Sequence, residues 1–325
     1  MGRTDLEVSQ LGLGGLFTSR HGGERKTSIR AIHAALDAGI NYIDTAPGYF
    51  DSEEVIGAAL SARTDRDELI ISTKLGGRPT PFDPHDVGAL KQSVETSLRN
   101  LGREVIDVLL IHEPDRPGQY AWWTNLPNAD GPVMDAIDQL KEEEKIRFAG
   151  LGGTTAYAMT RLVETGKFDV LLTAANYSLL WREATIELLP AANAIDMATV
   201  VGTPLQQGAL AARYDDQIAQ GAWWMAPPRR EQFRRLYELL DELDMPITEL
   251  AHRFLLSDPK ISCVLSGARS DSEILSNVAA SEADPLGADL IHRLNEIAEL
   301  VPFRPYDEPT ILPFGRTWDG PFELR

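Results

Sequence analysis

Cysteine is almost absent from this chain of 325 residues, and so are long hydrophobic runs. The one cysteine, Cys263, cannot form a disulfide within the chain, and its apolar neighbours predict a buried side chain. No apolar run approaches the roughly 18 residues of a membrane span, so no membrane partner is expected. The first residues lack the apolar segment of an export signal, and we therefore expect a cytoplasmic protein.

Positive charge is scarce, because 31 Lys and Arg face 49 Asp and Glu, which leaves a net charge of −18. A field of this sign repels phosphates, so no nucleic acid is expected as a partner. A small anionic ligand responds to local charges and stays open. The oligomeric state cannot be read from the sequence.

Eight short apolar runs alternate with helical patterns along the chain. Each run carries Val, Ile, Leu or Ala on both faces, as strands of a covered parallel sheet do. The intervening segments repeat apolar residues every three or four positions, which predicts amphipathic helices. The expected strands are Gln10–Gly15, Ile40–Thr45, Leu69–Lys74, Ile106–His112, Phe148–Gly152, Val170–Asn176, Ala198–Pro204 and Ile261–Gly267. The expected helices are Ser28–Ala38, Glu53–Leu60, Val87–Leu101, Pro132–Glu144, Ala156–Thr165, Glu183–Ala192, Arg230–Leu243, Ile247–Ser257, Ser270–Ala280 and Leu286–Leu300.

This alternation predicts an α/β fold, a single (β/α)8 TIM barrel domain over residues 1–325. An open doubly wound sheet is the alternative, but Gly12–Gly15 lacks the glycine spacing of a dinucleotide-binding fold. Arg3–Val8 is expected to form a hairpin across the barrel bottom, and long loops to lie over the C-terminal face. The tail, residues 301–325, is expected to cover the active site, with disorder as the alternative.

Polar side chains stand at the ends of three consecutive expected strands, namely Asp44, Lys74 and His112. Adjacent barrel strands lie about 5 Å apart, so these side chains are expected to share one pocket. Tyr49 follows Asp44 on a loop that can fold back over it. Each residue alone is more often structural, as a cap or in packing, but the four together indicate a functional site.

The chemistry of such a site follows from its groups. A phenol has a pKa near 10, and a nearby ammonium would lower that pKa by roughly one to three units. An ion pair with Asp44 would keep Lys74 charged, and His112 could donate a hydrogen bond to a carbonyl oxygen. Tyr49 could then protonate an alkoxide as it forms. No nucleophile is evident, so the reacting partner would be a hydride from a nicotinamide.

Several stretches resemble the aldo-keto reductase family: "GRTDLEVSQLGLGG", "AGINYIDTAPGYF", "ISTKLG", "DVLLIHEPD" and "SGARSDSEILSNVAA". The resemblance covers about 300 residues. It implies an NAD(P)-dependent oxidoreductase interconverting a carbonyl and an alcohol, with Tyr49 as general acid/base. Lys74 and Asp44 would tune the phenol, and His112 would orient the carbonyl. "AANYSLL" and "VVGTPLQQGAL" are most similar to the sugar and pyridoxal dehydrogenase branch, so a sugar or another polar carbonyl compound is the expected substrate.

The resemblance also implies a dinucleotide extended across the barrel mouth. NADP is the expected cofactor and NAD the alternative, because Arg269 suits a 2′-phosphate whereas Glu273 would repel one. The helix N-terminus at Ser270 suits a phosphate as well. The implied cofactor-binding residues are Gly15, Asn176, Thr203, Leu205, Gln207, Gly208, Ser266, Gly267, Ala268, Arg269, Ser270, Glu273 and Asn277.

The chain departs from the common family pattern around the nicotinamide. Gly152-Gly153 stands where many members have Ser-Asn, and Thr154 follows. Ala174 replaces a Gln, for which Asn176 could substitute, and Gly202 replaces a stacking aromatic. These departures put in doubt how the ring is held.

Aromatic residues are the candidate substrate contacts, because tryptophan suits flat or sugar-like rings. Packing of loop against barrel, or a dimer contact, is the alternative. No metal site is expected, since only Asp44 and His112 qualify as strand-end ligands. A nucleotide-sensing binding module with vestigial reductase activity is the alternative function, which retention of all four polar residues argues against. The candidate substrate-binding residues are Phe17, Trp122, Trp123, Trp224 and Trp318, with Phe314 as a further candidate from the tail.

Overall fold

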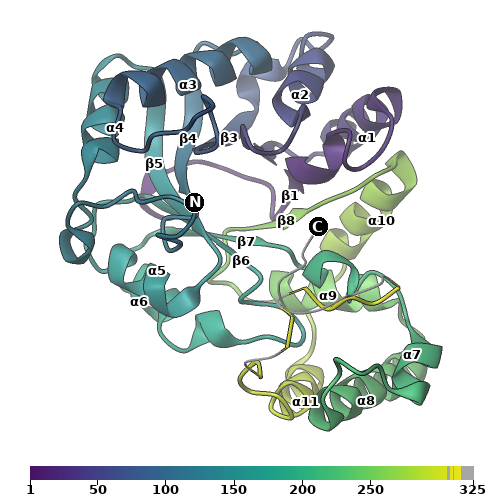
Figure 1. The fold of residues 1–325 in the computed structure, drawn as a ribbon. Coiled ribbons are helices and arrows are strands. Elements are labelled where there is room, and N and C mark those ends of the chain that lie inside the picture. The colour runs from purple at the N-terminus through teal and green to yellow at the C-terminus, as the bar shows by residue number, and fades with distance from the viewer. Residues whose placement is uncertain (306–307, 310, 316–325) are drawn as a thin grey trace.

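Eight parallel strands close into a barrel in the chain order β1 to β8, which confirms the predicted TIM barrel and excludes the open sheet. The computed structural model describes residues 1–305, 308–309 and 311–315. Helices surround the strands (Figure 1). The strands are β1 (Leu11–Gly14), β2 (Tyr42–Asp44), β3 (Ile70–Leu75), β4 (Ile106–His112), β5 (Ile146–Gly153), β6 (Val170–Ala174), β7 (Ala198–Gly202) and β8 (Cys263–Ser266).

The predicted helices are all present, but the one predicted at Glu183–Ala192 begins only at Leu188, after a 3-10 turn at Glu183–Thr185. The other helices differ from the prediction by small shifts at their ends. The helices are α1 (Arg25–Asp37), α2 (Ser52–Leu60), α3 (Val87–Leu101), α4 (Pro132–Glu142), α5 (Ala156–Val163), α6 (Leu188–Ala194), α7 (Asp215–Gln220), α8 (Pro227–Leu243), α9 (Ile247–Leu256), α10 (Asp271–Glu282) and α11 (Ala288–Ala298). The short α7 lies in a segment where no helix was predicted. No helix of the described ranges is long and apolar enough to cross a membrane.

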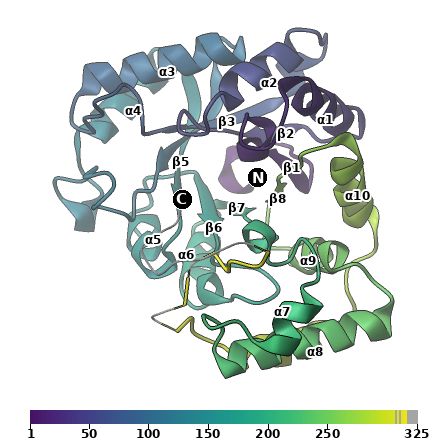
Figure 2. The ribbon, with the colours of Figure 1, turned by 45° about the vertical axis from the view of Figure 1, so that its right-hand side comes forward.

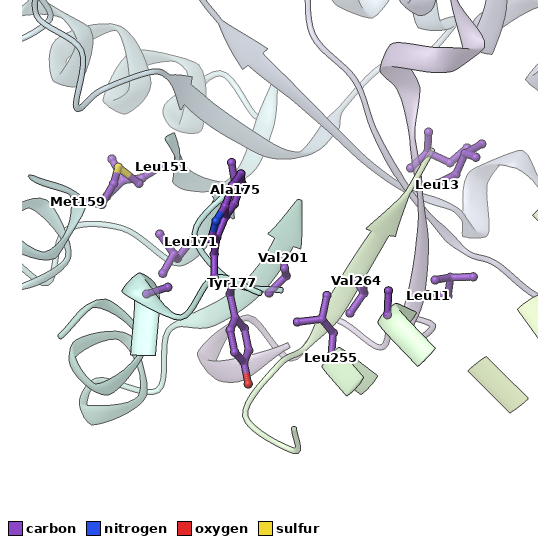
Figure 3. Close-up of a cluster of buried hydrophobic side chains, with 14 of the residues drawn as sticks. Leu11, Leu13, Leu151, Met159, Leu171, Ala175, Tyr177, Val201, Leu255 and Val264 are labelled. Atoms are coloured by element: carbon purple, nitrogen blue, oxygen red, sulfur yellow. The ribbon is translucent and has the colours of Figure 1, made fainter. Parts of the chain in front are cut away.

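The outward faces of the strands pack against the helices. Figure 3 shows part of this layer, in which Leu151, Leu171 and Val201 project from neighbouring strands. Val264 of β8 lies near Leu255 of α9 in the same view. All five side chains are buried, as strands covered by helices require.

The inward faces form a second apolar layer inside the barrel. Side chains alternate between the two faces with a period of two. Cys263 belongs to this inner layer and is buried, as predicted. The inner layer comprises Leu6, Tyr42, Ile70, Val108, Leu110, Val170, Leu172, Ala198, Val200, Cys263 and Leu265.

The predicted hairpin at Arg3–Val8 is wrong. The segment forms a 3-10 turn, η1 (Gly2–Thr4), followed by irregular chain. The Arg3 backbone N–H donates to the Asp196 carbonyl at 2.8 Å, and Leu6 inserts into the inner layer. The segment therefore closes the barrel bottom as a turn that bonds to the barrel, and no strand ladder forms within it.

The described part of the tail packs against α8, beside α7 and α9 (Figure 2). Arg229 of α8 binds Glu308 with both side chains almost completely buried. Phe314 stacks on Tyr214 with ring centroids 4.7 Å apart, and its ring lies 4.8 Å from that of Phe233. Phe314 is buried in this aromatic cluster, so the prediction that it contacts substrate is wrong.

Candidate active site

The four predicted polar residues lie together at the C-terminal rim of the barrel. Asp44 follows Tyr42 by two residues, and Tyr42 points into the barrel, so Asp44 points inward as well. Lys74 follows the inward-pointing Ile70 by four residues and His112 follows the inward-pointing Leu110 by two, so both side chains point inward as well. The alternation of each strand therefore aims its last polar residue at the mouth.

Lys74 and Asp44 form a buried ion pair. The Lys74 ammonium donates to Asp44 Oδ2 at 2.5 Å and to the Thr45 carbonyl at 2.7 Å. Ser72 donates to the other Asp44 oxygen at 2.9 Å. Burial raises the pKa of Asp44, and Lys74 and Ser72 oppose that shift only in part. Burial would lower the pKa of Lys74, but Asp44 and Tyr49 outweigh it and raise that pKa, so the ammonium stays charged.

Tyr49 is held over this pair by a tight turn. Its backbone N–H donates to the Ala46 carbonyl at 3.0 Å. Lys74 Nζ lies 4.8 Å from the centroid of its ring. The ring meets the His112 ring edge-on at 5.7 Å. The four groups thus form a chain of contacts from Asp44 through Lys74 and Tyr49 to His112.

The net shift of the Tyr49 pKa differs from the sequence-based prediction. Burial raises it, Lys74 lowers it, and the charges of Asp44 and Glu113 raise it further, so the pKa ends above its ordinary value. The prediction of a lowered pKa was wrong because it counted the ammonium and omitted burial. The phenol is therefore protonated at neutral pH.

His112 is neutral. Burial, followed by the charge of Lys74, lowers its pKa to about 3. Its Nδ1 is buried and finds no hydrogen-bond partner in the described part of the chain. A neutral imidazole carries one N–H and can donate to an oxygen without bringing a charge into the pocket.

The predicted phosphate loop after β8 rests on a buried hydrogen-bond chain. His252 Nδ1 lies 2.8 Å from the Thr248 carbonyl, which can only accept, so this nitrogen carries the proton. Its Nε2 therefore accepts from Ser266 Oγ at 2.9 Å, and Asn277 donates to the same Oγ at 2.8 Å. The predicted residues Ser266 and Asn277 are thus brought together, and His252 is a supporting residue that the sequence did not reveal.

The start of α10 forms a reciprocal cap. Ser270 Oγ accepts the Glu273 N–H at 3.2 Å, while the Glu273 carboxylate accepts the Arg269 N–H at 2.7 Å. The guanidinium of Arg269 lies over the Phe17 ring at 4.9 Å. The pattern Ser-Asp-Ser-Glu at 270–273 is the sequence signature of such a cap, so a structural role for Glu273 was readable.

The predicted pyrophosphate loop after β7 has an unusual backbone. Thr203, Gln206 and Gln207 all have positive φ angles, between 50° and 62°. Gln206 is buried, and its Nε2 finds no partner among the residues described. Residues with these angles turn the loop sharply, and an unpaired buried amide suits a phosphate oxygen. Gln206 was not among the predicted residues, although its neighbours Leu205, Gln207 and Gly208 were.

Four further predicted cofactor residues lie apart from these two loops or pack closely within them. Asn176 is buried and donates to Thr173 Oγ1 at 3.1 Å. A Cβ at Gly15 would lie 2.7 Å from the Asp44 carbonyl oxygen, and one at Gly267 would lie 2.6 Å from the Phe17 ring. Ala268 is buried beside Gly267. These close approaches explain the glycines by packing alone.

The orphan amide of Gln206, the capped start of α10 and the Arg269 guanidinium together fit a dinucleotide phosphate chain. These groups would hold its phosphates, and Arg269 would meet the adenosine end. The donor set is therefore compatible with the NAD(P) that the resemblance implies.

The predicted substrate aromatics are scattered. Trp122 is completely buried and donates its indole N–H to the His112 carbonyl at 2.9 Å, so it supports the strand end and offers no surface to a ligand. Trp123 donates to the Pro114 carbonyl at 2.8 Å and packs on Phe168. Packing of loop against barrel, the stated alternative, describes Trp122, whereas Trp123 is half-buried and lines a cavity with Pro127 and Tyr157, so its contact with substrate stays a prediction.

The remaining predicted aromatics also differ in their surroundings. Phe17 packs on Gly267 and Arg269, beside the predicted cofactor loop. Trp224 packs edge-on against Phe314 at 5.1 Å. Trp318 lies outside the described residues.

The departure at Gly152-Gly153 has a structural cause. A Cβ at Gly153 would lie 2.4 Å from Asp115 Oδ1. Asp115 occupies this space because its other oxygen accepts the backbone N–H groups of Thr154 and Thr155 at 3.0 and 2.5 Å. The Asp115 carboxylate thus binds the backbone N–H groups just before α5 and fills the space that a larger side chain at residue 153 would need.

Comparisons with known proteins agree with this geometry. The family described as "Aldo/keto reductase family" matches residues 10–299. Among solved structures, the aldo-keto reductase AKR11C1 from Bacillus halodurans, in its holo form, superposes with a TM-score of 0.74 at 26% identity, covering 95% of this chain and 98% of that one.

Curated relatives include reductases and dehydrogenases. An NADH-specific methylglyoxal reductase of Escherichia coli is 28% identical over 92% of this chain and 97% of its own length. A D-threo-aldose 1-dehydrogenase of a Pseudomonas species is 28% identical over 83% and 87% of the two chains. A pyridoxal 4-dehydrogenase of Microbacterium luteolum is 30% identical over 86% and 91%. The last two confirm the predicted similarity to sugar and pyridoxal dehydrogenases.

Proposed function

The chain belongs to the aldo/keto reductase family and is an NAD(P)-dependent oxidoreductase, and from this premise we propose that Tyr49 is its general acid/base in the interconversion of a carbonyl and an alcohol. The single observation that carries the proposal is the buried row in which Asp44 binds the Lys74 ammonium and that ammonium lies against Tyr49, beside a neutral His112. We further propose a sugar or another polar carbonyl compound as substrate, because relatives act on an aldose and on pyridoxal by name.

The four residues divide the proton chemistry among them. The His112 N–H donates to the substrate carbonyl oxygen and holds it beside the Tyr49 hydroxyl. The nicotinamide, when bound, supplies the hydride to the carbonyl carbon. Tyr49 gives its proton to the oxygen as negative charge develops there, and Lys74 stabilises the phenolate that remains. Asp44 keeps the ammonium charged throughout. In the reverse direction the same atoms remove the proton of the alcohol.

We propose NADP as the preferred cofactor, with NAD as the alternative. The Arg269 guanidinium contacts the Phe17 face and has no carboxylate partner in the described ranges, so it is free to meet a 2′-phosphate. The Glu273 carboxylate is engaged by the Arg269 backbone N–H. One relative is NADH-specific by name, and the choice is therefore a matter for measurement.

The test is the Tyr49→Phe variant, assayed at 340 nm with NADPH and NADH against a panel of aldoses and aldehydes. Removing a general acid costs about 100- to 10,000-fold in kcat, while cofactor binding measured by fluorescence should persist. Tyr157→Phe, a change at an exposed tyrosine of α5, is the matched control and should retain full activity. Undiminished turnover by Tyr49→Phe would contradict the proposal. Cofactor binding without turnover by the unaltered protein would favour a nucleotide-sensing module.

A further inference from the structure

Glu113 stands at the rim in a backbone conformation that few side chains adopt. It follows His112 directly, with a φ of 50°, and its N–H donates to the Gly152 carbonyl at 2.7 Å. A residue with a side chain in this left-handed region is uncommon and costs free energy. Such strain persists where the surroundings hold the residue in place, and it is concentrated at functional sites.

The carboxylate of Glu113 is only partly satisfied by the protein. Its Oε2 accepts from the Thr154 hydroxyl at 2.8 Å and lies 3.4 Å from Arg116 Nε. The Arg116 side chain is about half exposed, so this pair alone contributes little. No donor from the described part of the chain binds the other oxygen, Oε1, although the side chain is only 14% exposed.

The carboxylate also lies close enough to the catalytic groups to act on their charges. Its charge raises the pKa of Tyr49, while burial raises the pKa of Glu113 itself and Thr154, Arg116 and Lys74 oppose that shift only in part. Gly152 of β5, whose carbonyl accepts the Glu113 N–H, lies beside the Lys74 side chain, because a Cβ at Gly152 would lie 3.7 Å from Lys74 Cε. The groups that face Glu113 are therefore Lys74, Arg116, Asp115 and Thr154.

We propose that Glu113 selects substrates with a hydroxyl on the carbon next to the reacting carbonyl, and that it accepts a hydrogen bond from this hydroxyl. The inference rests on the proposed function, in which His112 holds the carbonyl oxygen. The residue next to His112 is then placed to meet the next oxygen of the substrate. A carboxylate can only accept, so it needs a donor such as a hydroxyl. A substrate with only hydrogen on that carbon leaves the carboxylate unpaired, which disfavours its binding.

The experiment compares lactaldehyde with propanal, which differ only in this hydroxyl, by their kcat/KM values. We expect the unaltered protein to favour lactaldehyde, and Glu113→Ala to lower that preference roughly 10- to 100-fold, as for loss of a charged hydrogen bond. Glu113→Gln keeps a hydrogen-bonding group without the charge. Its preference for lactaldehyde should therefore lie between that of the unaltered protein and that of Glu113→Ala. Glu142→Gln, at an exposed position of α4, is the matched control and should leave the preference unchanged.

Two further readouts separate this role from others. Thr154→Ala removes the hydroxyl that binds Oε2 but leaves the carboxylate, so the preference should persist. Fluorescence titration with NADPH should give the same affinity for Glu113→Ala as for the unaltered protein. A weakened affinity for NADPH would assign Glu113 to the cofactor instead and overturn the inference. An equal loss of activity on both aldehydes together with a shifted pH profile would also overturn it. No turnover by the unaltered protein on any carbonyl would overturn the proposed function, and the inference with it.

Discussion

The buried pair of Asp44 and Lys74 gives the sharpest quantitative prediction. Nζ and Oδ2 lie 2.5 Å apart with side chains 1% and 4% exposed, so removing one partner leaves a charge buried alone. The orphaned group can become neutral by gaining or losing a proton. The free energy of that protonation change is therefore the ceiling, the largest loss of stability that the buried charge can cause. At pH 7, protonating a carboxyl with an ordinary pKa of 3.8 costs about 4 kcal/mol, which limits the loss in Lys74→Met. Deprotonating an ammonium with an ordinary pKa of 10.5 costs about 5 kcal/mol, which limits the loss in Asp44→Asn.

The double variant Asp44→Asn with Lys74→Met contains neither charge. It loses only hydrogen bonds and some packing, about 1 to 2 kcal/mol. We therefore expect the sum of the two single-variant losses of stability to exceed the loss in the double variant. The difference, which is the coupling free energy, should be at least about 2 kcal/mol. The surface pair of Lys91 and Glu143 has the same N–O distance of 2.5 Å, but its side chains are 25% and 46% exposed. A double-mutant cycle on this pair should therefore give a coupling free energy below about 1 kcal/mol.

The single variants should also respond to pH in opposite senses. In Lys74→Met the folded-state pKa of Asp44 is raised above its unfolded value, so stability is present at low pH and lost as pH rises toward 7. At pH 5 the ceiling falls to about 2 kcal/mol. In Asp44→Asn the folded-state pKa of Lys74 is lowered, so stability recovers as pH rises, and at pH 9 the ceiling is again about 2 kcal/mol.

The assay is urea denaturation of the four proteins at pH 5, 7 and 9, followed by tryptophan fluorescence. Additive single-variant losses, or the same direction of pH dependence in both, would refute the reasoning. Either result would mean that water reaches the pair and solvates the orphaned charge.

The remaining predictions concern the end of β5 and the start of α10. Gly153→Ala should destabilise the fold by about 1 to 3 kcal/mol, because the new Cβ would lie 2.4 Å from both Asp115 Oδ1 and Met159 Sδ. Thermal denaturation would show this as a lowered melting temperature, and an unchanged melting temperature would mean that Asp115 is free to move. Glu273→Arg should shift the ratio of KM values toward NADP by adding positive charge beside Arg269, and an unchanged ratio would show that Glu273 serves only as a cap. The same change should cost about 1 kcal/mol of stability, since the Arg269 N–H loses its acceptor.

The rim of the site was predictable from the sequence because of strand alternation. Once a run such as Ile106–His112 is assigned as a strand, the inward face of Leu110 fixes that of His112. The loops obey no such period. Trp122 was expected to face a ligand, but its indole N–H finds its acceptor in the His112 carbonyl beneath the loop, a contact between segments that no local pattern encodes. The net pKa of Tyr49 was missed for a related reason, since burial depends on the whole fold.

The same alternation accounts for where the chain departs from its family. Gly152, Ala174 and Gly202 stand opposite the polar ends on the inward register, two residues after Gly150, Leu172 and Val200. The rim thus has a polar side on β2 to β4 and a side of small residues on β5 to β7.

The small residues on this second side are coupled to one another. A Cβ at Gly202 would lie 3.3 Å from Ala174 Cβ and 3.4 Å from Leu172, so a larger residue at 202 would need these neighbours to shift by a few tenths of an ångström. Positions 174 and 202 therefore lie in contact, and the side chains at both are small. The rim thus differs from the family pattern on the side of β5 to β7, where the ring would be held, and keeps the proton-transfer groups on β2 to β4, which leaves the acid–base chemistry in place.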